Sequence, residues 1–346
     1  MKKILVIFAA LCVMAMGACF SPWDGSDGQG TIVINLGNGG ARNADGEYTV
    51  FLTNSDGTAL PSQDTGGKAT FSVKPGHWNI AVHRGKGDNL NGYGETDVEV
   101  QAGATASASI NIRNLVPVGG EWNDLKEAIE KNQAEFVMLT KEVLIVNESI
   151  QIPSGRNITF LAQGSVTIKK ADDGKFDNSM FRVPSNSSLT LGIAGGMSGT
   201  ITFDGNKVKY MDGSSSSLIY VGNQRIYGSD RKTEGNGGTL TIYDGVILTN
   251  NYANIVGNPS LNNRGGAVVV DNGTFKMYGG EISKNTSTSS GGGVRVLSGT
   301  FKKTGGTIYG SDGGDNSNTA TGGGHAVYYD KSKKSIDKTL GPGDKL

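Results

Sequence analysis

The chain has 346 residues, enough for two domains of the usual ~100–200 residues. Glycine accounts for 54 residues, more than twice its usual share of ~7%, whereas proline accounts for only 8, so the composition fits neither collagen nor a low-complexity linker. Basic and acidic side chains balance at 32 each, so no net positive charge attracts nucleic acid, and no nucleic-acid partner is expected. These values indicate a glycine-rich chain of many short strands joined by tight turns.

The N-terminal residues have the pattern of an export signal. Lys2 and Lys3 precede an apolar run over 4–16 that is shorter than the ~20 residues of a membrane-spanning helix, so residues 1–18 are predicted to be a signal peptide. The run ends in Met16-Gly17-Ala18-Cys19, which resembles the lipobox of bacterial lipoproteins. That resemblance implies a palmitate-type lipid on Cys19 and a lipid-anchored place in the cell envelope, at the outer membrane or cell surface. The alternative is an ordinary secretory peptide cut after Ala18.

Cysteine usage and the next segment agree with a lipid anchor. Cys12 lies inside the apolar run and Cys19 at its end, so the exported chain has no pair of cysteines for an internal disulfide. Removing residues 1–18 leaves two more acidic than basic side chains, so charge does not hold the protein to anionic lipid. Residues 19–30 are rich in Gly and Ser and are predicted to be a flexible tether.

Apolar residues alternate with a period of two from Thr31 to Leu115, which predicts an all-β module, a β-sandwich, over 31–115. The expected strands are 31–36, 48–52, 69–73, 78–82, 96–100 and 106–112. The segments 73–82, with Pro75-Gly76 before an aromatic strand, and 98–103 resemble prealbumin-like (Ig-like), carboxypeptidase regulatory-like modules of secreted bacterial proteins. Such modules act as spacers or supports. His77 and His83 have no carboxylate or cysteine cluster beside them in the sequence, so neither a metal site nor a cofactor is predicted.

A short amphipathic helix is predicted next, with Asn123 as its N-cap. The residues expected on its apolar face are Trp122, Leu125, Ala128 and Ile129. Since a repeat array needs a cap over its first repeat, we expect this helix to cover the array that follows.

The array itself is the most informative part of the sequence. Residues 266–285 align with 292–308, a weaker copy starts at Gly322, and earlier copies of three short strands reach back to Ser149. One such copy cannot bury its own apolar residues, so the sequence predicts a parallel β-helix over 119–346, with Phe275 stacked on Phe301 and with Leu240 and Leu189 in the same row.

The pattern resembles the right-handed β-helix proteins of the pectin lyase-like superfamily. The phrase Gly305-Gly306-Thr307-Ile308 looks like the repeats of surface lipoproteins from spirochaetes such as treponemes. We further expect Asn250 and Asn285 to occupy equivalent turns and to stack their amides.

The resemblance implies that an enzyme of this superfamily would carry paired carboxylates on neighbouring strands. Asp204 is the best single acid, but the aligned copies offer it no acidic partner, and His325 aligns with Val294, an inward position. We therefore favour a non-enzymatic protein, with a polysaccharide lyase or glycoside hydrolase as the alternative. The alternative requires the following acids to converge beside Arg264 or Arg295: Asp204, Asp244, Asp271 and Glu281.

Loop length varies after each third strand, and in a repeat array such loops stack along one side. Their aromatic, amide and guanidinium groups suit adhesion to a glycan or an extracellular protein. The candidate binding residues are Tyr210, Tyr252, Asn258, Asn262, Arg264 and Asn318. The alternative is that exposed polar loops simply tolerate drift in length.

Overall fold

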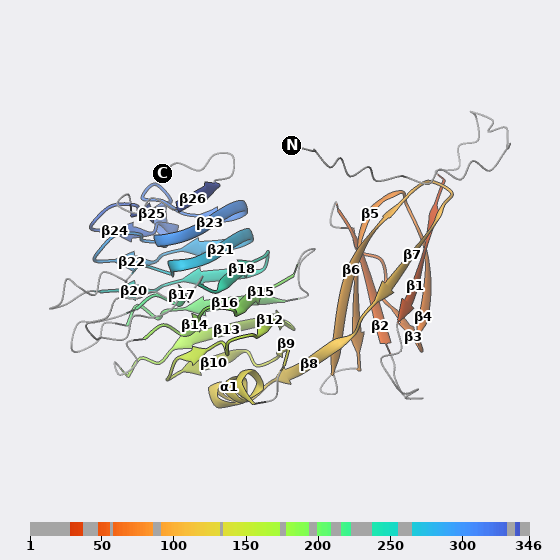
Figure 1. The fold of residues 1–346 in the computed structure, drawn as a ribbon, viewed down its shortest axis with the longest axis horizontal. Coiled ribbons are helices and arrows are strands. Elements are labelled where there is room, and N and C mark those ends of the chain that lie inside the picture. The colour runs from red at the N-terminus through yellow and green to blue at the C-terminus, as the bar shows by residue number, and fades with distance from the viewer. Residues whose placement is uncertain are drawn as a thin grey trace, which may run out of the picture.

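The computed structural model shows an all-β protein, as predicted (Figure 1). It describes residues 28–36, 48–55, 58–85, 91–131, 134–173, 178–193, 199–208, 216–222, 237–254, 265–330 and, for the backbone, 336–339. Cys19 and the rest of the predicted signal peptide and lipid-anchor motif lie outside these residues.

The first part of the chain forms two sheets that share one core. Its strands are β1 (Gly30–Leu36), β2 (Tyr48–Asn54), β3 (Gln63–Thr65), β4 (Lys68–Val73), β5 (Gly76–Arg84), β6 (Gly92–Val100) and β7 (Thr105–Ile110). In one sheet β1 lies between β4 and β7, and in the other β3, β2, β5 and β6 follow one another in antiparallel order. Alternate residues point inward, so that Ile34, Leu52, Phe71 and Trp78 from both sheets meet in one buried cluster. The six predicted strands are present; the short strand β3 was not predicted.

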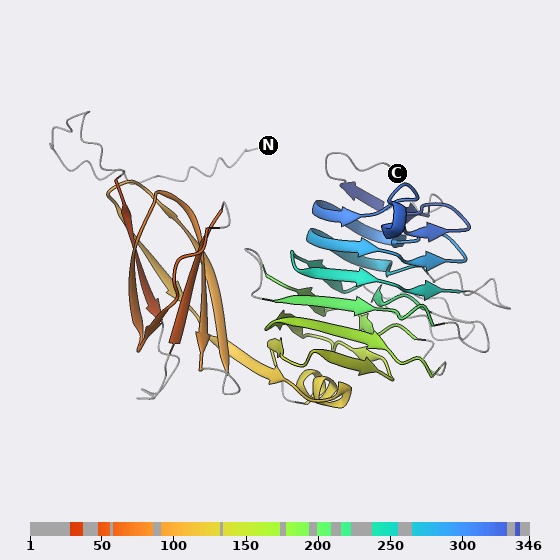
Figure 2. The same ribbon diagram turned by 180° about the vertical axis from the view of Figure 1, so that it is seen from behind.

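The rest of the chain forms a stack of parallel strands, in which three ladders run the length of the stack (Figure 2). Ladder A contains β8 (Arg113–Val118), β9 (Phe136–Leu139), β12 (Asn157–Ala162), β15 (Ser188–Leu191), β18 (Thr239–Ile242), the middle of β21 (Val268–Ser283) and of β23 (Val294–Ile308), and β26 (Ile336–Thr339). Ladder B contains β10 (Val143–Val146), β13 (Ser165–Lys170), β16 (Thr200–Asp204), β19 (Val246–Thr249) and the ends of β21 and β23. Ladder C contains β11 (Ile150–Gln151), β14 (Phe181–Val183), β17 (Ile219–Gly222), the starts of β21 and β23, and β25 (Val327–Tyr329).

From β9 onward the chain passes through ladders A, B and C in rotation, so each full turn adds one strand to each ladder. Strands β21 and β23 each run through all three ladders, in the order C, A, B. Strands β8, β9 and β10 come before the earliest copy identified in the sequence. The repeat pattern did not predict them, because their apolar runs lack the glycine-rich phrase of the later copies.

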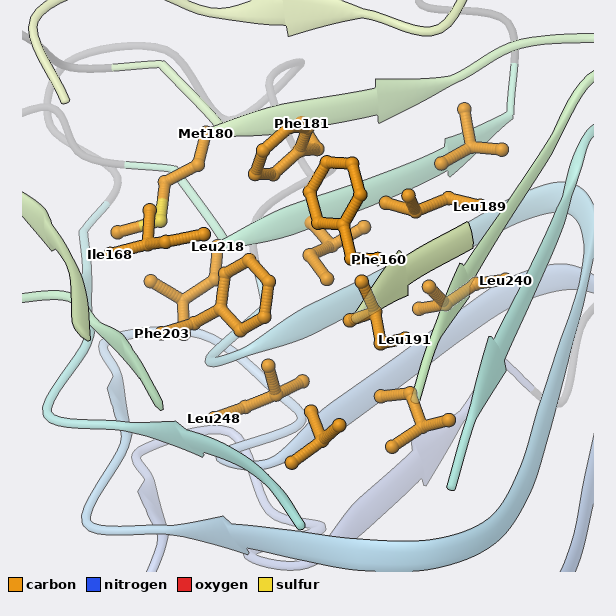
Figure 3. Packing of buried hydrophobic residues seen from close by; sticks show 14 of the residues in the cluster. Phe160, Ile168, Met180, Phe181, Leu189, Leu191, Phe203, Leu218, Leu240 and Leu248 are labelled. Atoms are coloured by element: carbon orange, nitrogen blue, oxygen red, sulfur yellow. The ribbon is translucent and has the colours of Figure 1, made fainter. Parts of the chain in front are cut away.

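The space between the ladders is filled by one continuous apolar cluster, which extends from Val118 to Tyr329. Figure 3 shows part of it: Phe160 from ladder A, Phe181 from ladder C and Phe203 from ladder B meet edge to face, with centroids 5.4 and 5.9 Å apart. The predicted row on ladder A is confirmed, since Leu189 pairs with Leu240, Leu240 with Phe275, and Phe275 with Phe301. The Phe275 and Phe301 rings are stacked with centroids 5.0 Å apart, and both side chains are fully buried.

Helix α1 (Trp122–Glu130) covers the first strands of this cluster. The four predicted apolar residues are buried, the Trp122 ring lies 5.3 Å from Phe181, and the Trp122 Nε1–H donates to the Glu148 carbonyl. The predicted N-cap was wrong: Glu121 is the N-cap and forms a capping box with Asp124, whereas Asn123 lies in the first turn. The capping box explains the shift, because it ties Asp124 Oδ2 to the Glu121 backbone N–H.

Strand β8 joins the two parts, because it pairs with β6 on one side and β9 on the other. At this junction Tyr93 and Phe136 pack with ring centroids 4.7 Å apart, and both are almost fully buried. The Arg113 guanidinium lies 4.4 Å from the Phe136 ring centroid. Leu161 and Ile193, on the outer side of ladder A, complete this junction cluster.

Candidate functional site

A fourth, shorter ladder stands at the corner between ladders B and C. It contains β20 (Tyr252–Ala253), β22 (Thr286–Ser287) and β24 (Thr319–Ala320), which pair in parallel. Its outer row is formed by Tyr252, Thr286 and Thr319. Two residues further along the chain from Tyr252 and Thr286, the Thr288 hydroxyl donates to Asn254 Oδ1 at 2.7 Å. We call these five residues the corner ridge. Its side chains are half-buried or exposed, and they offer hydroxyl, amide and phenol groups to solvent.

A buried row of asparagines supports the corner ridge from beneath. Asn285 Oδ1 accepts the Asn251 backbone N–H at 3.0 Å, and Asn318 Oδ1 accepts the Asn285 backbone N–H at 2.9 Å. The amide groups of the side chains donate to backbone carbonyls, as Asn285 does to Leu248 and Asn318 does to Tyr309. Asparagine therefore satisfies buried backbone groups that no strand partner reaches at this corner.

Two predictions about this row are corrected. The residue equivalent to Asn285 is Asn251 and not Asn250, because Thr249 pairs with Ser283. Asn250 and Lys284 instead adopt the left-handed turn that precedes the row, with φ of 53° and 58°. Asn318, predicted to bind a ligand, has 0% exposure and is committed to the buried row.

The buried ammonium of Lys170 closes the row at the opposite end from Asn318. Its Nζ donates to Asn251 Oδ1 at 3.2 Å and to the Ser216 carbonyl at 3.0 Å, and the residue is 1% exposed. Charge-assisted donation to two oxygens offsets part of the cost of burying a cation. Lys170 is thus positioned to hold the corner together and not to meet a ligand from solvent.

The connection that leaves the corner ridge is long in only one of the three copies that can be compared. Asn254 aligns with Thr288, and Gly265 aligns with Gly291, so residues 255–264 stand where the next copy has only Ser289 and Ser290. The copy after that has Gly322 and Gly323 there. Residues 255–264 are therefore an insertion beside the ridge.

Of the six predicted binding residues, only Tyr252 is described on the surface, where it is half-buried. Tyr210, Asn258, Asn262 and Arg264 lie outside the described residues. The last three belong to the insertion beside the corner ridge.

The four acids that an enzyme would need do not converge on one site. Asp204 and Glu281 both lie on ladder B, but Asp204 aligns with Ser283. Two strand spacings and two residues along the strand therefore separate their Cα atoms, which is about 12 Å at ordinary strand geometry. Asp271 lies on ladder C, and Asp244 lies in the turn after β18, where its carboxylate accepts the Gly280 backbone N–H one residue before Glu281. Of these four described acids, only Asp244 and Glu281 therefore lie on adjoining turns.

Asp271 is held inside the stack by hydrogen bonds to its neighbours. It is buried, and its carboxylate accepts hydrogen bonds from the Tyr220 hydroxyl at 2.7 Å and the Ser298 hydroxyl at 3.2 Å. On the same ladder, Arg295 donates to Ser289 Oγ at 3.0 Å, and burial lowers its pKa. Both charged groups are directed at neighbouring strands and connections of the stack.

The histidines also depart from the sequence reading. His77 faces two carboxylates across the strand pair, with Nδ1 3.5 Å from Glu99 Oε2 and Nε2 3.8 Å from Asp97 Oδ2, which a reading along the chain missed. His325 aligns with Gly292 and not Val294; its Nδ1 accepts the Ala320 backbone N–H at 3.1 Å. Within the described ranges, no group of three or more His, Cys, Asp or Glu side chains is placed to hold a metal ion.

One surface feature was missed in the sequence, a pair of tyrosines at the end of ladder A. Tyr243 follows β18 and Tyr278 lies in β21, and their rings are stacked with centroids 5.3 Å apart and planes at 23°. Tyr278 is 37% exposed, one of four large apolar side chains that stand out from the described surface. The signal was present, since Thr239-Leu-Thr-Ile-Tyr243 aligns with Thr274-Phe-Lys-Met-Tyr278.

The Asp244 carboxylate lies beside the tyrosine pair, and the charge of a second carboxylate, Glu95, acts on Tyr243. Asp244 is exposed, and its Oδ1 accepts the Gly280 backbone N–H at 3.2 Å. Glu95, on β6, accepts the Tyr93 hydroxyl at 3.0 Å at the junction. Burial, Tyr278 and the charge of Glu95 raise the pKa of Tyr243. Partial burial raises the pKa of Glu95 itself, although much of that side chain stays exposed.

No protein-family model and no curated protein sequence matches the chain. None of the helices within the described ranges has the length and apolar character to cross a membrane.

Proposed function

We propose that residues 31–115 form a β-sandwich, that residues 119–346 form a right-handed parallel β-helix of the pectin lyase-like kind, and that the whole is a non-enzymatic lipoprotein displayed on a bacterial surface. In this proposal Cys19 carries the lipid, the β-sandwich acts as a spacer, and the β-helix binds a glycan or an extracellular protein. The rotation of the chain through three parallel ladders around one apolar cluster supports the architecture. The similarity to spirochaete surface lipoproteins remains a resemblance of repeats.

The observation that carries the proposal for function is that the four acids do not converge on one site beside an arginine. Hydrolysis of a glycosidic bond ordinarily needs two carboxylates within ~5–9.5 Å of one another. The backbones of Asp204 and Glu281 are about 12 Å apart by strand spacing, and Asp271 is engaged by two hydroxyls. Asp244 and Glu281 lie on adjoining turns, but Arg295 stands on ladder C and not beside them. The corner ridge, in contrast, is a regular polar strip with an insertion at its edge, which suits binding.

We expect the full chain, purified in detergent, to bind at least one member of two panels: immobilised neutral oligosaccharides, and fibronectin and collagen. Release of reducing ends or of unsaturated uronate from the same oligosaccharides would contradict the non-enzymatic proposal. Absence of binding to both panels would contradict the binding proposal.

Replacing residues 255–264 by Ser-Ser, as found in the next copy, should weaken binding to a protein ligand about tenfold or more, because insertions between repeats commonly carry the contacts to a ligand. Surface plasmon resonance of the variant and the wild type measures this. The thermal midpoint should stay near that of the wild type, since the next copy already tolerates the short turn. Unchanged affinity in a folded variant would exclude the insertion from the binding site.

The Cys19→Ala variant should leave the membrane fraction. Two or three acyl chains anchor a protein stably, at ~0.8 kcal/mol per buried CH₂, and without Cys19 no acylated residue remains in this proposal. Fractionation of cells, together with incorporation of labelled palmitate, measures the loss. A variant that stays in the membrane, combined with a wild type that takes up no label, would show that the lipoprotein reading is wrong.

A further inference from the structure

We propose that the stacked pair Tyr243 and Tyr278 is a carbohydrate-binding site, which holds the ring of a neutral hexose against the exposed ring of Tyr278. The inference rests on the proposed binding function and assigns a glycan to a surface away from the corner ridge.

The first argument is that the next strand carries only small residues, Thr304 and Gly305, beside the tyrosine stack. Tyr243 covers one side of the Tyr278 ring. On the other side, Tyr278 pairs with Gly305 of β23. A Cβ at Gly305 would lie 2.0 Å from the Tyr278 carbonyl oxygen, so the backbones approach too closely for any side chain there. The next strand therefore sets a glycine and a threonine beside the ring, and Tyr278 is 37% exposed.

The second argument is the chemistry of an exposed aromatic ring beside a carboxylate. A pyranose presents a face of C–H groups, which packs on the electron-rich face of a tyrosine, and a rim of hydroxyls, which donate to carboxylates. Asp244 follows Tyr243 directly, is exposed, and is fixed next to the turn after Tyr278 by the Gly280 N–H. Together these groups supply one stacking surface and one acceptor.

The third argument is that donors stand on the same outer side of ladder A. Thr241 and Lys276 pair with one another two residues before the tyrosines, and neither is buried. Because residues two apart in a strand face the same side, these donors share a face with the rings. Hydroxyl groups of a sugar both donate and accept, so a face with donors and acceptors around a ring suits a sugar better than a purely apolar partner.

The test uses the full chain in detergent and an array of neutral oligosaccharides built from glucose, galactose, mannose or N-acetylglucosamine. We expect Tyr278→Ala to lower affinity for the bound glycan about tenfold, the effect of losing one well-stacked ring. Tyr278→Phe, which keeps the ring, should stay within about threefold of the wild type. Tyr278→Leu, which keeps apolar bulk without a flat ring, should behave like Tyr278→Ala. Phe51→Ala, which removes an equally exposed ring from β2 in the first part of the chain, is the matched control and should leave glycan affinity unchanged.

The outcomes separate this inference from the proposed function. If the wild type binds a glycan but Tyr278→Ala and Tyr278→Leu bind it equally well, the site is elsewhere and the binding function stands. If it binds fibronectin or collagen and no glycan, the carbohydrate site is wrong while the binding function again stands. If it binds neither panel, both proposals fall.

Discussion

Truncation of Phe275 or Phe301 to alanine should lower the free energy of unfolding by about 3–5 kcal/mol, the usual cost of emptying a filled aromatic site. Both rings have 0% exposure, and each is stacked on the other at 5.0 Å. The surrounding strands cannot easily move inward to fill such a cavity, because backbone pairing along the ladders fixes their positions. The loss should therefore approach the full value at either position.

Chemical denaturation followed by far-ultraviolet circular dichroism measures this loss. In a stack of strands each turn is supported only by its neighbours, so hydrogen exchange should accelerate together in β18, β21 and β23. Phe51→Ala is the matched control: that ring is 37% exposed in the first part of the chain, and we expect a loss of about 1 kcal/mol or less. A loss of similar size in Phe51→Ala and Phe275→Ala would contradict the account of the core.

The phenylalanine row was predictable because large side chains fix the register of a repeat. Residues 266–285 and 292–308 share Gly-Thr-Phe-Lys at one position, and a slip of one residue would turn every apolar side chain outward. Glycines carry no such information. Three of them in succession at 322–324 allowed His325 to be aligned two residues out of register, and only the pairing of Val294 with Val327 corrects it.

The corner was harder to predict, because two asparagines compete for one position. Asn250 and Asn251 are both polar and both fit a turn, but only one backbone is left-handed and only one side chain reaches its neighbour. The structure assigns the left-handed turn to Asn250, and Lys284 takes the equivalent place in the next copy. Since lysine is not a typical turn residue, no rule of composition selects it.

The junction and the tyrosine pair differ in how far the sequence could predict them. Tyr93 meets Phe136 only because β8 pairs with strands of both parts, which no repeat or period encodes. Tyr243 and Tyr278, in contrast, are visible once their two phrases are aligned. Variation in loop length does not mark them, because the pair lies at the end of strands of constant register.

Removal of the Asn285 side chain is the second change with a large expected effect. Its carbonyl oxygen accepts the buried Asn251 N–H, and its amide donates to the Leu248 and Ser283 carbonyls, at 2.8–3.0 Å. In Asn285→Ala these groups lose their partner at a site with 0% exposure. Each buried group left without a hydrogen bond costs ~1–3 kcal/mol, so we expect the free energy of unfolding to fall by about 2–4 kcal/mol.

The same denaturation experiment, with Asn254→Ala as its control, distinguishes this buried network from surface polarity. Asn254 accepts a hydrogen bond from Thr288 on the corner ridge, where water replaces a lost partner, so its truncation should cost about 0.5 kcal/mol or less. Asn285→Asp should be at least as damaging as Asn285→Ala at neutral pH, because a carboxylate cannot donate to the two carbonyls and is buried with its charge. Lowering the pH should restore part of the stability of Asn285→Asp, since a protonated carboxyl regains one donor. An Asn285→Asp protein as stable as the wild type at neutral pH would show that the asparagine row does not hold the corner in place.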